Sequence, residues 1–453
     1  MLLKAQKATV GVLRYPRNVT MSVKSEPLNI LIVGAGLGGL FASLALRQDG
    51  HRVTLLDASA EFKEAGAGIR IPPNSTRLLR RWGIEIDQMK KCICRGYHFL
   101  RWQDGSTIRK IPFEDMVARH GEQYYLVHRA DLHASLLAAA VKAGVAIHKD
   151  RLVTSYDFSV PMAITADSEK WVADLIISAD GIKSTARPLL TGQPDHPRDT
   201  GDVAYRILIP GQDLLADPDL ASLITHPETT SWCGPNAHLV GYPIRDGELY
   251  NIVVCATSKG ETTDETWVVE GDNAELCARF SRWEPRVQKL CRLAKSFMKW
   301  RLCDLPVLST WVHPSGKACL LGDSCHPMLP YLAQGAAQAA EDAATIRKAL
   351  AEETDITKTL KRYERIRSPR ASLIQTKTRD HQYILHIADG DEQCRRDELM
   401  REDNPSNPIF WGYELRRDWL FSHDAERMED ATTELLRECE QTKVLQYVDH
   451  CYS

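Results

Sequence analysis

The chain has 453 residues, of which 43% are hydrophobic and 26% are charged, and its formal net charge is −3. This balance is ordinary for a globular protein and disfavours nucleic acid or an anionic membrane as the main partner. No run of eighteen apolar residues occurs, so no membrane-spanning helix is expected. The length allows two or three domains.

The twelve cysteines are scattered, and Cys92 and Cys94 form their one tight pair. The spacing C-x-C matches neither a zinc knuckle nor a redox C-x-x-C. We therefore expect reduced thiols and a cytoplasmic location. The sequence has no H-x-x-x-H pattern, and no metal site is predicted.

The first 25 residues carry five cationic side chains and no acidic one. Residues 1–27 are interpreted as a disordered extension or a leader, and a mitochondrial-type leader is the less favoured interpretation. Translation from Met21 is a third alternative, because it would leave a short polar segment before the first strand.

A strand–helix–strand pattern begins at residue 28. A short apolar strand over 28–33 leads into Gly34, Gly36 and Gly39 in the spacing G-x-G-x-x-G. A helix is predicted over 40–47, and a second strand over 52–56 ends at Asp57. This context is typical of a dinucleotide-binding unit and leaves open whether NAD(P) or FAD is bound.

Each residue of this pattern has a physical task. Gly34 permits the tight turn, Gly36 lets the backbone approach a pyrophosphate, and Gly39 lets the helix pack on the strand. Asp57 can accept hydrogen bonds from ribose hydroxyls.

Two further strand–turn motifs follow. DLIISADGIKSTAR (174–187) places Asp180 directly after an apolar strand, and ACLLGDSCHP (318–327) places Asp323 after another. About 140 residues separate them, which is room for an inserted sheet layer. A helix is predicted from Gly335 and Ala336, small residues that leave its first N–H groups open to a ligand.

The intervening segment predicts strands. VAYRILIP (203–210) alternates, and 233–256 predicts two strands around a turn. Arg206 and Tyr242 are candidate substrate residues, although Arg206 could pair with a surface acid and Tyr242 could be a core aromatic. His128, His238 and His326 are interpreted as structural histidines.

Residues 345–430 predict helices, with a helical pattern over 358–385 that breaks at Pro369. The three motif segments resemble those of single-component FAD-dependent aromatic hydroxylases, the group A flavoprotein monooxygenases. GAGIRIPPNSTRLLRRWGI (66–84), VHRADLHASLL (127–137) and MLPYLAQGAAQAAEDAA (328–344) resemble the salicylate-hydroxylase-like branch. That branch is common in fungal aromatic and polyketide secondary metabolism.

The resemblance implies an α/β fold with a Rossmann-like FAD-binding domain like that of 4-hydroxybenzoate hydroxylase. The FAD-binding domain would comprise residues 28–190 and 306–350, interrupted by a β-sheet substrate domain over 191–305. A helical region over 351–453 would complete the chain.

The resemblance also implies roles for individual residues. Arg206 and Tyr242 would hold the substrate phenolate, and the helix starting at Gly335 and Ala336 would point its N-terminus at the flavin pyrimidine edge. The remaining residues expected to bind or adjoin FAD are Gly34, Gly36, Gly39, Asp57, Gly68, Arg70, Arg129, Asp180 and Asp323.

The implied activity is hydroxylation of a phenolic aromatic by FAD, NADPH or NADH, and O2, through a flavin C4a-hydroperoxide. Decarboxylation or dearomatisation can accompany it, and the substrate class is salicylate-like, orsellinate-like or an aromatic polyketide. Alternatives on the same fold are a flavin epoxidase, an amine oxidase and a non-catalytic binding protein. Monomer and homodimer both remain open.

Overall fold

The computed structural model describes residues 26–62, 67–260 and 267–427. The interpretations of residues 1–25, and of the C-terminal stretch 428–453, concern segments outside these residues. Among the described helices, none combines the length and the apolar character needed to cross a membrane.

A five-stranded parallel sheet joins the three motifs, in the order β19-β12-β1-β2-β8. The register aligns Val33 with Ser178 and Ser178 with Leu320, so three turns far apart in sequence leave the same edge. The strands are β1 (Asn29–Val33), β2 (Arg52–Leu56), β8 (Ala146–His148), β12 (Leu175–Ser178) and β19 (Ala318–Leu320).

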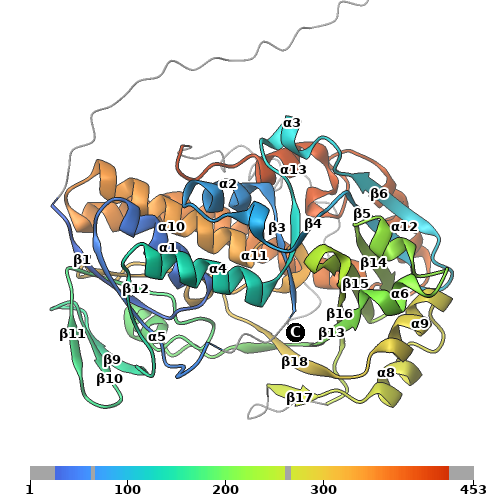
Figure 1. Ribbon diagram of the computed structural model, residues 1–453, viewed down its shortest axis with the longest axis horizontal. Coiled ribbons are helices and arrows are strands. Elements are labelled where there is room, and N and C mark those ends of the chain that lie inside the picture. The colour runs from blue at the N-terminus through green and yellow to red at the C-terminus, as the bar shows by residue number, and fades with distance from the viewer. Residues whose placement is uncertain (1–25, 63–66, 261–266, 428–453) are drawn as a thin grey trace, which may run out of the picture.

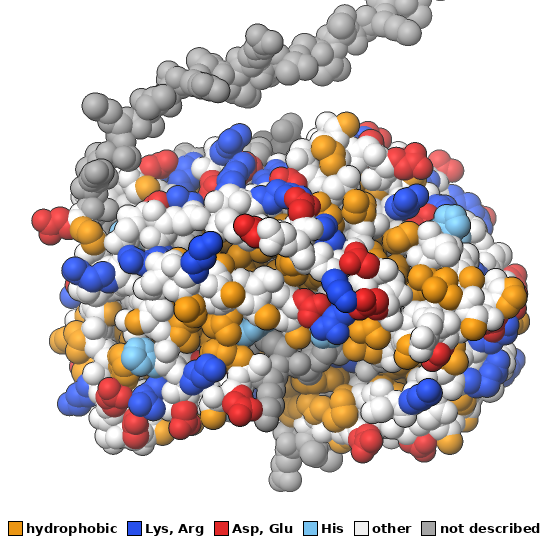
Figure 2. Space-filling view, viewed as in Figure 1, with side chains coloured by type: hydrophobic (Ala, Val, Ile, Leu, Met, Phe, Trp, Pro, Cys, Tyr) orange, Lys and Arg blue, Asp and Glu red, His pale blue; other side chains and the backbone are white. Residues whose placement is uncertain are grey.

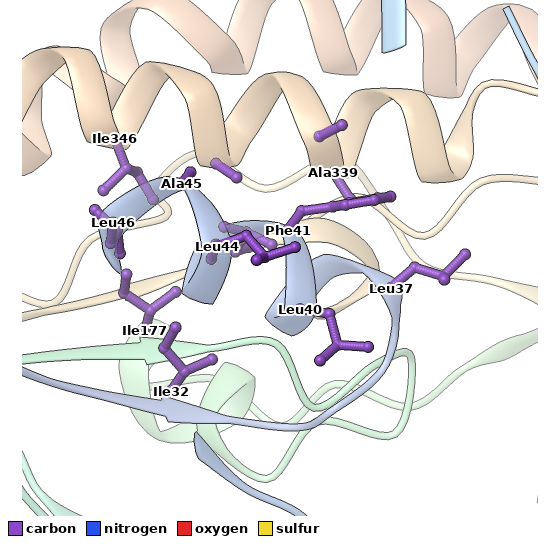
Figure 3. Packing of buried hydrophobic residues seen from close by; sticks show 14 of the residues in the cluster. Ile32, Leu37, Leu40, Phe41, Leu44, Ala45, Leu46, Ile177, Ala339 and Ile346 are labelled. Carbon is purple, nitrogen blue, oxygen red and sulfur yellow. The ribbon is translucent and has the colours of Figure 1, made fainter. Parts of the chain in front are cut away.

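Helix α1 (Leu37–Gln48) packs between this sheet and α10 (Gly335–Glu352). Figure 3 shows Ile32 and Ile177 of the sheet on one side of α1, and Ala339 and Ile346 of α10 on the other. All four side chains are buried. Alanines at the contact allow the two helices to approach closely, which fixes the start of each helix relative to the sheet.

An eight-stranded sheet forms the second half of the molecule, on the right in Figure 1, in the order β17-β18-β13-β16-β15-β14-β5-β6. Its first two strands in the chain, β5 and β6, precede the predicted insertion over 191–305. The strands are β5 (Gly96–Arg101), β6 (Thr107–Pro112), β13 (Arg198–Pro210), β14 (Thr229–Gly234), β15 (Ala237–Ile244), β16 (Leu249–Thr257), β17 (Val268–Glu270) and β18 (Phe297–Asp304).

The two faces of this sheet have different neighbours. Tyr205, Leu239 and Val254 belong to a buried cluster on one face, which also includes Leu276 and Leu290 of the helices that follow. Residues of the other face join a cluster with α11. The helices of the first face are α6 (Gly211–Leu215), α7 (Ser222–Thr225), α8 (Asn273–Arg279) and α9 (Pro285–Leu293).

Two small sheets and the remaining helices complete the described chain. The antiparallel sheets are β3 (Gly68–Ile71), β7 (Tyr125–His128) and β4 (Lys91–Ile93), and β11 (Lys170–Val172), β10 (Met162–Thr165) and β9 (Val153–Asp157). The helices are α2 (Pro73–Arg81), α3 (Met116–His120), α4 (Arg129–Lys142), α5 (Ala186–Thr191), α11 (Ile356–His386), α12 (Asp391–Arg401) and α13 (Glu414–Phe421).

The predicted break at Pro369 is wrong, because α11 continues through this residue to His386. The buried arginines on either side of it explain the continuity. Arg367 and Arg370 both donate hydrogen bonds to the buried carboxylate of Glu341 on α10. These contacts hold the helix across a residue that costs about 3 kcal/mol in a helix interior.

Acidic and basic side chains are interspersed over the face of the molecule in Figure 2, and neither sign gathers over one half. This distribution agrees with the small net charge of the chain.

Candidate active site

The glycine-rich turn between β1 and α1 is closed toward the sheet and open on one side. Gly34 has a φ of +103°, and a Cβ there would lie 2.3 Å from the carbonyl oxygen of Ala179. A Cβ on Gly39 would lie 1.9 Å from the carbonyl oxygen of Gly34. A Cβ on Gly36 would meet no described atom within 4 Å. A ligand can therefore approach the backbone at Gly36.

Asp57, just beyond β2, closes this turn with its carboxylate. Its Oδ2 accepts a hydrogen bond of 2.7 Å from the backbone N–H of Ala35, and its Oδ1 accepts one of 2.8 Å from Ser59. An ionised carboxylate has about four acceptor sites. Asp57 can therefore hold the turn and still accept from a ligand hydroxyl.

Asp180 follows β12 and is held by its own loop. Its two oxygens accept hydrogen bonds from the hydroxyl of Ser178 (2.8 Å) and the backbone N–H of Thr185 (2.9 Å). Arg187 on α5 donates to the carbonyl oxygen of Cys325 at 2.8 Å. The Asp-Gly and Gly-Asp segments are thereby tied to each other.

Asp323 lies in the 3₁₀ turn η3 (Gly322–Ser324) after β19. Its side chain is exposed, yet burial raises its pKa, while His326 and Arg129 act in the opposite direction. A side chain with open surface in such an enclosed environment lines a cavity inside the protein. Arg129, at the start of α4, has its pKa lowered by burial and by Arg206, and raised by Asp323.

The start of α10 is a second open helix N-terminus. Gly335 is its first residue, and a Cβ there would meet no described atom within 4 Å. No described side chain caps the first turn of α10 or of α1. Gln334, the N-cap residue, has a buried Nε2 without a hydrogen-bond partner among the described residues. Ala336 is half-buried beside it.

These features fit FAD. Free N–H groups at the start of α1 suit the phosphates, and those at the start of α10 suit an electron-rich ring. Asp57 and Asp323 offer acceptors for sugar hydroxyls. At Gly36 and Gly335 a side chain would occupy the space beside the backbone, and glycine leaves that space open to a ligand. The residues present therefore fit FAD.

The inner face of the eight-stranded sheet lies next to this region. Strand register places Arg206 opposite Val253 on β16 and Met298 on β18. Trp300 is two residues beyond Met298 on β18, so its side chain lies on the same face. All four side chains keep open surface although β13, β16 and β18 are interior strands. The described elements therefore leave the middle of this sheet face partly open, as a wall of apolar side chains with one guanidinium that a ligand can reach.

Arg206 lies in this wall with its Cζ 4.7 Å from the ring centre of Trp300. Burial lowers the pKa of the guanidinium, and Tyr242 acts in the opposite direction. Because arginine remains charged in proteins, this half-buried cation favours an anionic group beside it.

Tyr242 is buried where β15 meets β3. A Cβ on Gly68 would lie 2.6 Å from its ring, and the Cζ of Arg70 lies 5.9 Å from the ring centre. Burial raises the pKa of Tyr242 to about 12, although Arg70 and Arg206 act to lower it. Its hydroxyl is therefore protonated at neutral pH. Asn251 accepts from the backbone N–H of Gly68 at 2.6 Å.

A family model described as "FAD binding domain" matches residues 28–378. The FAD-dependent monooxygenase OpS4 of Beauveria bassiana (strain ARSEF 2860) is 36% identical over 421 residues, covering 90% of this chain and 97% of that protein. The chain belongs to the FAD-dependent monooxygenases.

Further comparisons agree with this family. The 3-hydroxybenzoate 6-hydroxylase 1 of Aquipseudomonas alcaligenes is 33% identical over 407 residues, covering 87% of this chain and 98% of that protein. A salicylate hydroxylase solved with its substrate has the same fold, with a TM-score of 0.72 at 24% identity over 89% of this chain and 99% of that one. The resemblance and the α/β fold class expected from the sequence are thereby confirmed.

In this FAD-dependent monooxygenase the predicted site residues lie in one region. The glycines, Asp57, Asp323 and the start of α10 lie at the edge of the parallel sheet, and mutual electrostatic effects connect Asp323, Arg129, Arg206 and Tyr242. The carboxylate of Asp180 lies after β12, and each of its oxygens accepts a hydrogen bond within its own loop, as the oxygens of Asp57 do in theirs.

Sequence reasoning missed two residues that lie beside the predicted substrate residues. Trp300 gave no signal, since only strand pairing brings it to Arg206. Asn251, a polar residue in an apolar strand, could have been noticed, and its Nδ2 is buried without a partner among the described residues. His238, which is interpreted as structural, is buried on the same sheet face as Tyr242 and is hydrogen-bonded to His386.

Proposed function

We propose that this monooxygenase hydroxylates a phenolic aromatic substrate of the salicylate, orsellinate or aromatic polyketide class, using NADPH or NADH and O2. The observation that carries the proposal is Arg206, a guanidinium set among apolar and aromatic side chains on the partly open sheet face. Such a wall suits a planar ring that bears one ionisable oxygen. Relatives with phenolic acids in their names support this substrate class.

Bound FAD supplies the redox chemistry, namely hydride acceptance and reaction with O2. This chain's residues supply charge and orientation. Arg206 stabilises the ionised phenol, which makes the ring carbons electron-rich, and the neutral hydroxyl of Tyr242 donates a hydrogen bond that orients the ring. The open N–H groups at the start of α10 stabilise negative charge by about 0.3–2 kcal/mol, and more where water is excluded.

The test is a screen of the purified holoenzyme with salicylate, orsellinate, 3-hydroxybenzoate and resorcylic phenols. We expect a phenol to stimulate NAD(P)H oxidation and to acquire one oxygen atom from ¹⁸O₂, read by product mass. A protein that retains FAD but oxygenates an alkene or oxidises an amine, and no phenol, would overturn the proposal.

A further inference from the structure

His238 lies in β15 on the sheet face that carries Tyr242 and Arg206, because residues 238, 240 and 242 alternate to one side. The imidazole is buried, and its ring centre is 5.3 Å from that of Tyr331. Burial lowers its pKa, and Arg70, which lies over Tyr242, lowers it further together with a neighbouring histidine. His238 therefore lies on the same sheet face as Arg206 and Tyr242, beneath the surface.

The neighbouring histidine is His386, the last residue of α11. Its Nε2 lies 2.8 Å from Nδ1 of His238, which is a hydrogen bond between the two rings. Its Nδ1 lies 3.4 Å from Oδ2 of Asp202 on β13. Three residues far apart in sequence thus form a line that begins on the sheet face of Arg206 and ends at a carboxylate.

Asp202 is buried at the end of this line. The hydroxyl of Tyr331 donates a hydrogen bond of 2.9 Å to its Oδ2. Burial raises the pKa of this carboxyl, and hydrogen bonds from Tyr331 and Gln382 and the charge of Arg279 act in the opposite direction. The carboxylate thus accepts hydrogen bonds from its neighbours, while burial keeps the pKa of Asp202 above its ordinary value.

The hydrogen atoms of the line can be assigned from these contacts. Burial lowers the pKa of His386 to about 3 and that of His238 well below its ordinary value, so each ring carries one proton at neutral pH. The carboxylate of Asp202 can only accept, so the proton of His386 is on Nδ1. Its Nε2 then accepts from Nδ1–H of His238. The free lone pair of His238 is consequently on Nε2.

We propose that Asp202 and His386 are positioning residues that hold His238 with Nε2 as a proton acceptor, and that the three together remove the proton of the substrate phenol. The inference rests on the proposed function, since it assigns the route by which the phenol ionises beside Arg206.

In the proposed proton transfer, each histidine ring gains one proton as it gives up another, so neither becomes a charged imidazolium. The phenol O–H bond breaks as Nε2 of His238 gains the proton, Nδ1–H of His238 passes to Nε2 of His386, and Nδ1–H of His386 passes to Asp202. Negative charge moves from Asp202 to the phenolate, and Arg206 pairs with it. Burial disfavours a charged ring, and this route avoids one.

The other charged and titratable groups around the line do not compete for these positions. His381 donates from Nδ1 to the carbonyl oxygen of Lys377, and its Nε2 accepts from the backbone N–H of Phe410. Arg396 donates to Asp397 and to the carbonyl oxygen of Ile384. The remaining neighbours with an electrostatic effect on the line are Arg70, Cys255 and Arg279.

The first test reads the tautomers directly, in the FAD-loaded enzyme without substrate. Proton-detected ¹⁵N spectra of labelled histidine distinguish Nδ1–H, Nε2–H and charged rings. We expect His238 and His386 both to remain in the Nδ1–H form from about pH 5 to pH 8. An Nε2–H form or a charged ring at either residue overturns the proposal, whatever the substrate is.

The second test uses the pH dependence of turnover with the phenol that stimulates the enzyme. Asp202→Asn and His386→Gln should lower the rate about 10²–10⁴-fold at neutral pH, and the loss should shrink as pH approaches the pKa of the free phenol. Asp213→Asn and the exposed His196→Gln are the matched controls. A loss that is equal at every pH indicates a structural role and overturns the proposal.

The two tests separate failure of the relay from failure of the proposed function. If no phenol is hydroxylated, the proposed function fails, and the ring tautomers still decide how His238 is held. If phenols are hydroxylated and the tautomers differ from those expected, the relay alone fails. Should Asp202→Asn not fold, Tyr331→Phe removes a hydrogen bond that lowers the pKa of the same carboxyl. The carboxylate then becomes a stronger proton acceptor, so the pH profile is expected to shift to lower pH, opposite to the shift expected for Asp202→Asn.

Discussion

The edge of the parallel sheet and the inner face of the eight-stranded sheet form the site in different ways. At the first, the backbone conformation determines the binding surface. Gly34 turns with a positive φ, and α1 and α10 begin without side-chain caps among the described residues. At the second, side chains from several strands meet, and Arg206 contacts Trp300 across the sheet.

This difference shows which half depends on local sequence. A turn and a helix start are set by residues within a few positions of each other, whereas a cavity wall is set by strand register. The cofactor half should therefore respond to backbone changes through stability and FAD retention. The substrate half should respond to side-chain changes through kinetics alone.

The largest expected effect breaks this comparison, because one part of the cofactor half depends on distant side chains. Glu341 on α10 accepts hydrogen bonds from Arg367, Arg370 and Asn74 at 2.6 to 2.7 Å, all in the interior. Glu341→Ala leaves Arg370 without its carboxylate partner and leaves Arg367 with Asp342 alone. We expect a loss of about 3–5 kcal/mol in the free energy of unfolding, measured by urea denaturation.

This carboxylate also gives a pH dependence. Burial raises the pKa of Glu341, but Arg370 and Arg367 lower it more, so the folded value is below the ordinary 4.5. Its stabilisation is therefore complete above the unfolded pKa and is lost as pH falls below it. The variant should lose part of this acid sensitivity. Glu352→Ala, in the same helix but half-exposed, should change stability by less than about 1 kcal/mol, and an equal loss in both variants would contradict the assignment.

A pair of glycine variants sharpens the comparison within the turn. Gly39→Ala places a Cβ 1.9 Å from a backbone oxygen, whereas Gly36→Ala places one in open space. We expect Gly39→Ala to lose about 1–3 kcal/mol of stability even without FAD. Gly36→Ala should fold as stably as the wild type, within about 1 kcal/mol, and retain less FAD. Urea denaturation of the apoprotein and flavin absorbance separate the two, and equal stabilities would show that the turn can relax.

The same contrast explains how much the sequence could predict. The glycine turn, Asp57 and Asp323 are where the motifs place them, because each follows a strand end that the apolar pattern reveals, and α10 starts where the small residues after Pro330 predict a helix. The closeness of β5 to β14 gave no local signal, since parallel pairing between residues 97 and 229 is decided by the packing of the whole sheet.

Non-local packing also explains the misjudged helix and the missed residues. Pro369 disfavours a helix locally, and the two buried arginines beside it hold α11 through partners on α10. The line from His238 to Asp202 depends on His386 reaching β15 from the end of a helix of 31 residues. No spacing rule connects these positions.

In the substrate half, Arg206→Ala should separate kinetics from stability. Loss of a charge-assisted hydrogen bond to the phenolate is expected to lower kcat/KM roughly 30- to 150-fold, which corresponds to about 2–3 kcal/mol of lost transition-state stabilisation. FAD content and unfolding should stay as in the wild type. Arg198→Ala, at the exposed start of the same strand, is the matched control, and a comparable kinetic loss there would show that the effect is not specific to the cavity.

The smallest expected effect concerns Tyr242→Phe, which removes one hydroxyl and keeps the ring that packs on Gly68. Loss of one neutral hydrogen bond should lower kcat/KM roughly 2- to 12-fold, which corresponds to about 0.5–1.5 kcal/mol of lost transition-state stabilisation. Because burial holds the pKa of this hydroxyl at about 12 despite Arg70 and Arg206, the tyrosine stays protonated over the working range. The ratio of wild-type to variant kcat/KM should therefore be the same at every pH below about 9. A ratio that changes across that range would mean that Tyr242 itself gives up its proton. The proposal that Tyr242 orients the substrate as a neutral donor, while Arg206 alone supplies charge, would then be wrong.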